Sequence, residues 1–427
     1  MQHCERYRDP VHGFIEVRPL EKKIIDTVAF QRLRNIKQLA MTYLVFHGAE
    51  HTRFAHSIGV MHLVSRAFKS AMKNSDYKIP SEKIEWYEQI LRLIALTHDL
   101  GHAPFSHAAE AVFPPGLKHE DFTEKIIKDT EIADIIAEIG NEYKEKYGES
   151  FDITPELICK IYSGKKAGEK GEFILLRTFM DSELDCDKMD YLLRDSLYCG
   201  VNYGIYDIDR LISSLTVYER NGGTPRLAID RGGVQAFEEF VLARYFMFIQ
   251  VYFHRTRRYF DIMYARALKK ILPKGKFPES TLEYLKWDDC KVISIMKENC
   301  DEIEECSNII KRKVYPRILR SKTHPVKSEK DLYKLKRKIL YDKIGNNYFI
   351  EDNSADKMPH KIPSRTDDSD PKAIPILDRK MSYCSTISEE SHIISSLTEK
   401  INIMRIYVHP SQKDKSYKII KEINEDI

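Results

Sequence analysis

The segment Leu96–Glu110 reads LTHDLGHAPFSHAAE and places a histidine and an aspartate, His98 and Asp99, at the end of a strongly apolar stretch. Leu91 and Ile94 precede His98 by seven and four residues, so the helical period puts His98 on the buried side. A buried imidazole beside a carboxylate is costly unless another group neutralises the pair. This combination at an inward-facing helix end suits a divalent metal ion.

Two ligands do not hold a catalytic metal, so other parts of the chain must supply more. His56, in the segment TRFAHS, begins an apolar pattern that also points inward. Farther along, DSELDCDKMDYLLRD places Asp187, Tyr191 and Asp195 four residues apart on one stripe of a helix. Taken singly these signals are weak, because most buried histidines are hydrogen-bonded core residues and most polar stripes are solvated faces.

The order of these features, a histidine, a His-Asp pair and a later aspartate, matches the HD superfamily of metal-dependent phosphohydrolases. Longer segments resemble the HD-domain deoxynucleoside triphosphate (dNTP) triphosphohydrolases, and most of all the branch with a sterile alpha motif, although that motif is absent here. The similarity runs from about residue 8 to about residue 270 and continues more faintly to the end. The segments that carry it are DPVHGFIEVRPLEKKIIDTVAFQRLRNIKQL, HTRFAHSIGV, THDLGHAPFSH, KHED and DCDKMDYLLRD.

The resemblance implies an enzyme that cleaves a dNTP at the α-phosphorus into a deoxynucleoside and inorganic triphosphate. It assigns the metal ligands to His56, His98, Asp99 and Asp187. It assigns the catalytic groups to His102, His107 and His119, with Glu110 where the family has a supporting aspartate. It assigns the sugar contacts to Gln38, Leu39, Tyr191 and Asp195, and the phosphate contacts to Arg53, Lys188, Arg244, Tyr252 and His254.

These residue types make chemical sense for phosphoryl transfer. A cation bound by two histidines and two aspartates can lower the pKa of a bound water from about 15.7 toward about 7. Nitrogen ligands favour Mn, Fe, Ni or Zn, while Mg can accompany the triphosphate. His107 and Glu110, at i and i+3, can pair so that the carboxylate orients the ring, which makes His107 the acid/base candidate with His119 as its partner. Leu39 offers no partner to a 2′-hydroxyl, which favours deoxyribose.

The same resemblance implies a nucleotide effector at a subunit interface, and therefore a homo-oligomer, either a dimer or a tetramer. The guanine-recognising positions of that site fall on Asp26, Gln31 and Arg34. The family's lysine and asparagine before Asp-Pro are Glu5 and Arg8 in this sequence. Glu5 would repel a triphosphate and Arg8 could hold one, so GTP, a dNTP and another signalling nucleotide all stay open as the effector.

Other functions compete with a dNTP triphosphohydrolase. One is an HD-type nucleotidase or phosphodiesterase acting on other nucleotides, which the three cations Arg53, Lys188 and Arg244 disfavour because they suit a polyphosphate. Another is a catalytically silent nucleotide-sensing regulator, which the complete set of metal ligands disfavours. Nucleic-acid binding is not expected, because the net charge is only +3 and no basic patch is interleaved with aromatic residues.

The elements that must position these residues are mainly helical. We expect a helical HD-domain bundle with a small β-hairpin over residues 1–272, and a mixed α+β lobe over 273–427. The hairpin is predicted around Asn-Gly-Gly in LTVYERNGGTPRLAID. Residues 164–171 and 352–372 are predicted to be flexible loops. Helices are predicted from Thr27 and over about 53–71, 81–99, 120–139, 154–162, 172–198, 207–215 and 234–270.

The composition indicates the class of protein and the compartment in which we expect it. The 427 residues are 42% hydrophobic and 31% charged, which is typical of a globular protein. The eight cysteines have no regular spacing, which fits reduced thiols in the cytoplasm. No apolar run approaches the length of a membrane span, and the N-terminal residues do not resemble a signal peptide, so we expect no membrane association.

Overall fold

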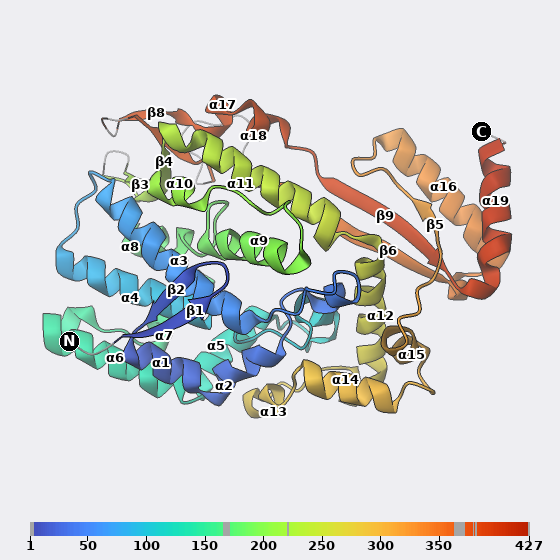
Figure 1. The fold of residues 1–427 in the computed structure, drawn as a ribbon, viewed down its shortest axis with the longest axis horizontal. Coiled ribbons are helices and arrows are strands. Elements are labelled where there is room, and N and C mark those ends of the chain that lie inside the picture. Colours follow the sequence, from blue (N-terminus) through green and yellow to red (C-terminus); the bar gives the residue numbers. More distant parts are fainter. Residues whose placement is uncertain are drawn as a thin grey trace.

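The computed structural model describes residues 4–164, 171–219, 222–362, 372–378, 380 and 382–425. The fold of the described residues is mainly helical, and helices and strands mix in its C-terminal region, as the sequence predicts (Figure 1). The sequence predicts the β-hairpin at residues 215–230 but not the one at residues 5–17. The predicted loop at 164–171 falls largely outside the described residues. Each helix in the described part of the chain is too short or too polar to cross a lipid bilayer.

Three helices form the centre of the N-terminal part. The helices α3 (Arg53–Lys73) and α4 (Ser81–Thr97) pack along each other, and α9 (Cys186–Cys199) packs against α3. Gly59 allows the close approach of α3 and α9, because a Cβ atom there would lie 2.1 Å from a carboxylate oxygen of Asp190. The side chain of Asp185 caps α9 by accepting a hydrogen bond from the backbone N–H of Lys188 at 2.8 Å.

The helices predicted over 154–162 and 207–215 are present as α7 (Pro155–Ser163) and α10 (Ile208–Ser213), whereas other helix predictions for this part differ from the structure. The spans 120–139 and 172–198 were each expected to be one helix, and each is interrupted. The pattern that begins at Thr27 forms only a short helix and a 3₁₀ turn, Arg32–Asn35. The backbone is extended at Ile36, and Lys37 pairs with Thr52 in a β-bridge. The bounds are α1 (Pro19–Asp26), α2 (Val28–Gln31), α5 (His119–Asp129), α6 (Ile132–Tyr147), α7 (Pro155–Ser163), α8 (Gly171–Thr178) and α10 (Ile208–Ser213).

The prediction of one long helix over 234–270 was wrong. The chain forms α11 (Val234–Met247), a π-helical turn at Phe248–Tyr252 and then α12 (Arg255–Ile271). The wide turn closes with a hydrogen bond from the N–H of Phe253 to the carbonyl of Phe248 at 2.8 Å. Tertiary contacts stabilise the break, because the Tyr252 hydroxyl donates to Asp195 at 2.7 Å.

Three small sheets complete the fold. The hairpin of β1 (Glu5–Asp9) and β2 (Gly13–Val17) lies at the N-terminus. The predicted hairpin is present as β3 (Leu215–Tyr218) and β4 (Arg226–Asp230), and β7 (Pro375–Leu377) and β8 (Tyr383–Thr386) extend its sheet. Because β7 pairs in parallel with β4, this sheet crosses the boundary predicted at residue 272. The third sheet has the order β5 (Arg317–Arg320), β9 (Ile401–Val408) and β6 (Phe349–Lys357).

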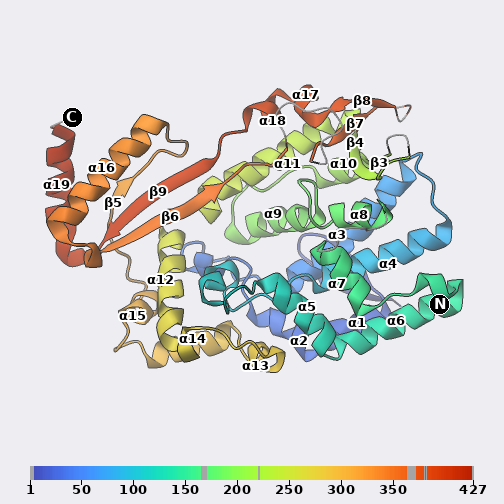
Figure 2. The same cartoon turned by 180° about the vertical axis from the view of Figure 1, so that it is seen from behind.

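The strands β6 and β9 connect the helical body to a smaller end, which is formed by α16 (Lys327–Ile344) and α19 (Lys413–Glu425) (Figures 1 and 2). The prediction of a loop over 352–372 was wrong for residues 352–357, which belong to β6. Asp352 is buried there and forms ion pairs with Arg258 and Arg405. Residues 363–371 of that loop lie outside the described part. The helices here are α13 (Thr281–Leu285), α14 (Asp289–Glu298), α15 (Glu304–Ile310), α16 (Lys327–Ile344), α17 (Ile387–Glu390), α18 (His392–Ser396) and α19 (Lys413–Glu425).

Candidate metal and phosphate-binding site

The four predicted metal ligands converge from three helices. His56 comes from α3, His98 and Asp99 follow the end of α4, and Asp187 lies in the first turn of α9. Ligand atoms of His56, His98 and Asp99 lie within 4.8 Å of one another, and the Nε2 atom of His56 is 3.0 Å from Asp187 Oδ1. The buried Nε2 atoms of both histidines have no hydrogen-bond partner in the described structure. Two such nitrogens facing two carboxylates fit a divalent metal ion.

The other ring nitrogens of these histidines are held in place. The Nδ1 atom of His98 donates to the carbonyl of Ala95 at 2.6 Å, and that of His56 donates to Asp190 at 2.7 Å. Donation from Nδ1 leaves each Nε2 with a free lone pair that can bind a metal. Asp190 is itself held by Arg194 at 2.8 Å and by His12 at 2.6 Å.

The electrostatics of this centre favour a cation. Burial lowers the pKa of His56, but the neighbouring carboxylates of Asp187 and Asp190 outweigh burial and raise it to about 10. Burial would raise the pKa of Asp190, yet the Arg194 guanidinium holds it well below its usual range. The carboxylates are therefore ionised, and the site attracts positive charge.

A second cluster contains the predicted catalytic histidines. Nitrogen atoms of His102, His107 and His119 lie within 4.8 Å of one another. His107 pairs with Glu110 at 2.7 Å, and His119 lies 3.4 Å from the same carboxylate oxygen. These contacts lower the pKa of Glu110 against the effect of burial. His102 contacts Asp99 at 3.2 Å, and burial together with Arg53 keeps its pKa well below the usual value, so that His102 is neutral.

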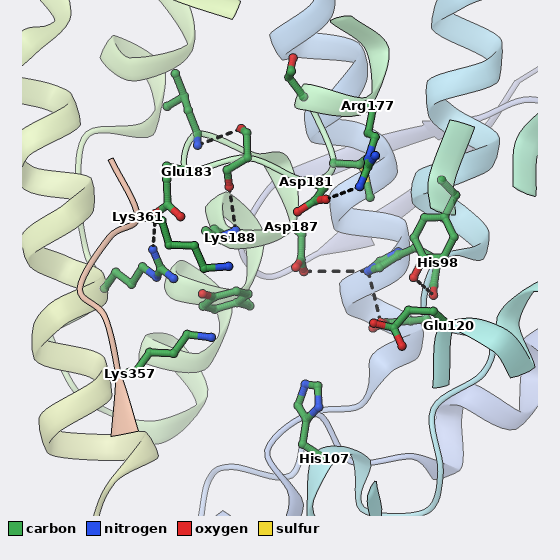
Figure 3. Close-up of a pocket in the computed structure, with 18 of the residues that line it drawn as sticks. His98, His107, Glu120, Arg177, Asp181, Glu183, Asp187, Lys188, Lys357 and Lys361 are labelled. Carbon is green, nitrogen blue, oxygen red and sulfur yellow. Dashed lines mark hydrogen bonds and ion pairs between the residues drawn. The ribbon is translucent and has the colours of Figure 1, made fainter. Parts of the chain in front are cut away.

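Both clusters open into one cavity of about 1650 Å³, which the predicted substrate contacts also line. Figure 3 shows Asp187 between Lys188 and His98, with His107 below them in the view. Asp195 accepts hydrogen bonds from His51 and from the Tyr252 hydroxyl, each at 2.7 Å. The predicted contacts found in the lining are Gln38, Leu39, Arg53, Lys188, Tyr191, Asp195, Arg244 and Tyr252.

His254 is the predicted phosphate contact that the cavity lining does not include. Its ring packs edge-on against Phe46, with the ring centroids 5.8 Å apart. Its buried Nδ1 atom has no hydrogen-bond partner in the described part of the chain. The break before α12 turns His254 away from the lining to which Tyr252 contributes.

Comparison with known proteins identifies the family. Residues 53–176 match the HD domain, and residues 206–420 match the HD associated region. The chain belongs to the HD-domain family. This HD-domain protein has the phosphohydrolase fold of the family, and the family recognised from the sequence is confirmed. The match to the HD associated region alone covers half of the chain.

Individual relatives of this HD-domain protein include two sequences and one crystal structure. YwfO of Bacillus subtilis is 38% identical over 63% of this chain and 55% of its own length. The deoxynucleoside triphosphate triphosphohydrolase SAMHD1 of Gallus gallus is 32% identical over 71% of this chain and 53% of its own length. A hypothetical protein from Aquifex aeolicus is 32% identical and superimposes with a TM-score of 0.79, covering 98% of this chain and 100% of that one. The chain thus spans about half the length of the first two relatives.

Asp289 is a site residue that sequence reasoning missed. Its carboxylate accepts hydrogen bonds from the backbone N–H of Lys37 at 2.8 Å and of Phe105 at 2.7 Å. Phe105 and Ser106 both have positive φ angles, 55° and 53°, just before His107. The only signal in the sequence is an acidic residue at the start of a helix, which is common and unspecific. His51, the partner of Asp195, was missed as well.

The predicted effector residues lie around α1 and α2, outside the cavity. Arg34 donates to the side-chain oxygen of Gln31 at 2.7 Å and lies over the ring of Phe54, 3.5 Å from its centroid. Gln31 also donates to the carbonyl of Ile25 at 2.7 Å. Asp26 pairs with Lys22. The structure therefore brings Gln31 and Arg34 together, with Asp26 on the preceding helix.

Proposed function

We propose that this HD-domain protein is a metal-dependent dNTP triphosphohydrolase that releases a deoxynucleoside and inorganic triphosphate. The observation that carries the proposal is the joining of three groups in one cavity: the His-Asp cluster, the histidine cluster and a polar recess around Asp195. Asp187 and Asp195 lie two turns apart on one face of α9, so this helix holds the metal centre and the sugar recess at about 12 Å from each other. The similarity to SAMHD1 supports the choice of substrate.

The metal would be held by His56, His98, Asp99 and Asp187, and the two nitrogen ligands favour Mn, Fe, Ni or Zn, with Mg accompanying the triphosphate. When bound, the ion supplies Lewis acidity toward phosphate oxygens and water. A water oxygen would bond to the α-phosphorus as the bond from the α-phosphorus to the 5′-oxygen breaks, and the triphosphate would keep the oxygen of that water. His107, oriented by Glu110 and assisted by His119, would give a proton to the leaving 5′-oxygen. Arg53, which pairs with Asp99, would donate hydrogen bonds to oxygens of the α-phosphate.

Sugar selectivity would come from the recess beside α9. Asp195 and Gln38 would bind the 3′-hydroxyl, which is supported by their position in the cavity lining and by the buried Oε1 atom of Gln38, which has no hydrogen-bond partner among the described residues. Leu39 would press on the 2′ carbon and offers nothing to a hydroxyl there. An unsatisfied 2′-hydroxyl costs about 1–3 kcal/mol, which favours deoxyribose.

We also propose that the active form is a homo-oligomer and that a nucleotide effector binds near Asp26, Gln31 and Arg34. Support comes from the proximity of Gln31 and Arg34 on α2 and the turn that follows it. An aspartate and a glutamine-arginine pair can together read the hydrogen-bonding edge of a base.

The test of the enzymatic proposal is a product analysis. The metal-loaded protein is incubated with each of the four dNTPs, the four rNTPs and a deoxynucleoside monophosphate, and the products are separated by chromatography. We expect deoxynucleoside and inorganic triphosphate from dNTPs and little turnover of rNTPs. The Asp187→Ala variant is expected to lose both bound metal, measured by elemental analysis, and turnover. Release of pyrophosphate, or turnover of the monophosphate alone, contradicts the proposal and favours an HD nucleotidase.

A further inference from the structure

The three cations that the sequence assigns to the phosphates are already paired with carboxylates. Arg53 pairs with Asp99, Lys188 with Asp185, and Arg244 with Glu183. Each pair is close to neutral as a unit, so these side chains together bring little net positive charge to the cavity. A triphosphate carries several negative charges, which these pairs alone do not balance.

Two lysines of the C-terminal region add positive charge to the cavity without an ion pair to a described carboxylate. Lys357, at the end of β6, and Lys361 line the same cavity, and neither has a carboxylate partner within the described residues. Figure 3 shows both side chains on the side of Lys188, with Asp187 between them and His98. Lys118, a further lysine of the lining, is exposed and lies next to His119 at the histidine cluster instead.

The backbone directs these lysines inward. Neighbouring strand residues point to opposite faces, and Asp356 pairs with Lys400 at 2.8 Å, while Lys357 lies in the cavity lining. Between the two lysines, buried His360 donates from Nε2 to the carbonyl of Ile394 at 2.9 Å and accepts from the N–H of Ile362. The segment from 357 to 361 is therefore anchored to the protein.

Positively charged side chains lie close together on this side of the cavity, where Lys357 and Lys361 form what we call the lysine wall. The Nζ atom of Lys357 lies 5.8 Å from the ring centroid of Phe248, and the guanidinium of Arg244 lies 5.7 Å from the same centroid. Burial, followed by the charges of Arg244, Lys361 and Lys188, lowers the pKa of Lys357. The buried Nε atom of Arg244 also has no hydrogen-bond partner in the described structure. Crowded cations with an unused buried donor form a site that is completed by a polyanion.

We propose that Lys357 and Lys361 bind the distal phosphates of the substrate, so that the HD associated region completes the polyphosphate site. The identity of the polyphosphate as that of a dNTP rests on the proposed function. The metal centre and His107 lie across the cavity at the reacting end, and the lysine wall lies where a phosphate chain leads away from it. A deoxynucleoside has no phosphates, so we expect these lysines to contribute nothing to the affinity for it.

The test is calorimetric titration of the metal-loaded protein with inorganic triphosphate, which does not depend on turnover. The variants are Lys357→Gln, Lys361→Gln and the double variant, with Lys357→Arg as the conservative replacement. Lys400→Gln is the matched control, because Lys400 pairs with Asp356 and is absent from the cavity lining. We expect Kd for triphosphate to rise about tenfold or more in the double variant, to recover in Lys357→Arg and to stay unchanged in Lys400→Gln.

Kinetics separate this inference from the proposed function. With a dNTP, the glutamine variants are expected to raise KM in parallel with Kd for triphosphate and to leave binding of a deoxynucleoside unchanged. If the unaltered protein turns over no dNTP while triphosphate binding still depends on Lys357 and Lys361, the proposed function fails and the polyphosphate site stands. If the double variant binds triphosphate as tightly as the unaltered protein, the inference is overturned whatever the substrate.

Discussion

The carboxylate of Asp289 accepts a hydrogen bond from the backbone N–H of Phe105, 2.7 Å away. Its second oxygen accepts from the N–H of Lys37, which precedes the sugar recess. Ser106 adds a bond from its hydroxyl to the carbonyl of Lys37 at 2.7 Å. One buried aspartate from the associated region thus holds two loops of the N-terminal part, one that leads to His107 and one that leads to Gln38.

The first prediction concerns the stability linked to Asp289. Burial raises the pKa of this residue to about 7 in the folded protein, while an unfolded aspartate titrates near 3.9. Between these values the folded state binds more protons than the unfolded state, so Asp289 makes the free energy of unfolding fall as the pH rises from about 4 to about 7. The upper limit of this contribution is about 4 kcal/mol.

Urea denaturation at several pH values in this window measures the effect. The Asp289→Asn variant is expected to show a flatter dependence of unfolding free energy on pH than the unaltered protein. Its turnover is expected to fall mainly through kcat, because the amide donates where the carboxylate accepts and the loop to His107 shifts. Parallel pH dependences in the two proteins would argue against an elevated pKa of Asp289.

The second prediction concerns Asp190 and the affinity for metal. Asp190 orients His56 through a 2.7 Å hydrogen bond, and loss of such an outer partner typically weakens metal binding roughly 10- to 100-fold. Competition with a chelator measures this in Asp190→Asn. The exposed Asp209→Asn, which removes only a surface pair with Arg66, serves as the control. Equal metal affinity in all three proteins would show that His56 does not depend on Asp190.

The third prediction concerns Leu39 and the choice of sugar. The unaltered protein is expected to prefer dATP over ATP at least about tenfold in kcat/KM, since a hydroxyl against Leu39 stays unsatisfied. In Leu39→Ala this ratio is expected to fall by more than the rate on dATP falls. Ile36→Val, at a buried neighbour outside the cavity lining, controls for general loosening. A preference that survives Leu39→Ala would place sugar selection elsewhere.

The fourth prediction concerns effector-driven assembly. The rate on one dNTP is measured with and without a second nucleotide, alongside the molar mass by light scattering. We expect both to rise with the effector in the unaltered protein and to respond less in Arg34→Ala. Because Arg34 also covers Phe54, the thermal stability of the variant is compared first. A rate and a mass that no nucleotide changes would indicate a constitutive enzyme.

The residues that the sequence revealed lie on regular helices or directly after them. His56, His98 and Asp187 could be placed because helical periodicity and the order of the motif constrain them locally. Lys357, Lys361 and Asp289 could not be found in this way, because only the folding of the C-terminal region onto the N-terminal part brings the two lysines to the cavity and Asp289 to the backbone of Phe105. No local pattern distinguishes them from ordinary surface charges or helix caps.

The break at Phe248–Tyr252 is a backbone feature that the local sequence pattern likewise could not predict. Residues 234–270 have a continuous helical pattern, and the hydrogen bond of Tyr252 to Asp195 outweighs that local preference. The loop prediction was wrong at residues 352–357 for a related reason. Its polar composition indicated exposure, but Asp352 is satisfied inside the protein by Arg258 and Arg405.

The parallel pairing of β7 with β4 has a consequence for the synthesis of the protein. Asp230 is in register with Leu377, so about 150 residues must leave the ribosome between the two strands before they can pair. The HD helices can pack much earlier, since their contacts are closer in sequence. The proposed metal ligands, which end at Asp187, are therefore synthesised well before Lys357 and Lys361, and a polypeptide that stalls near residue 300 contains all four of those ligands but neither of the two lysines.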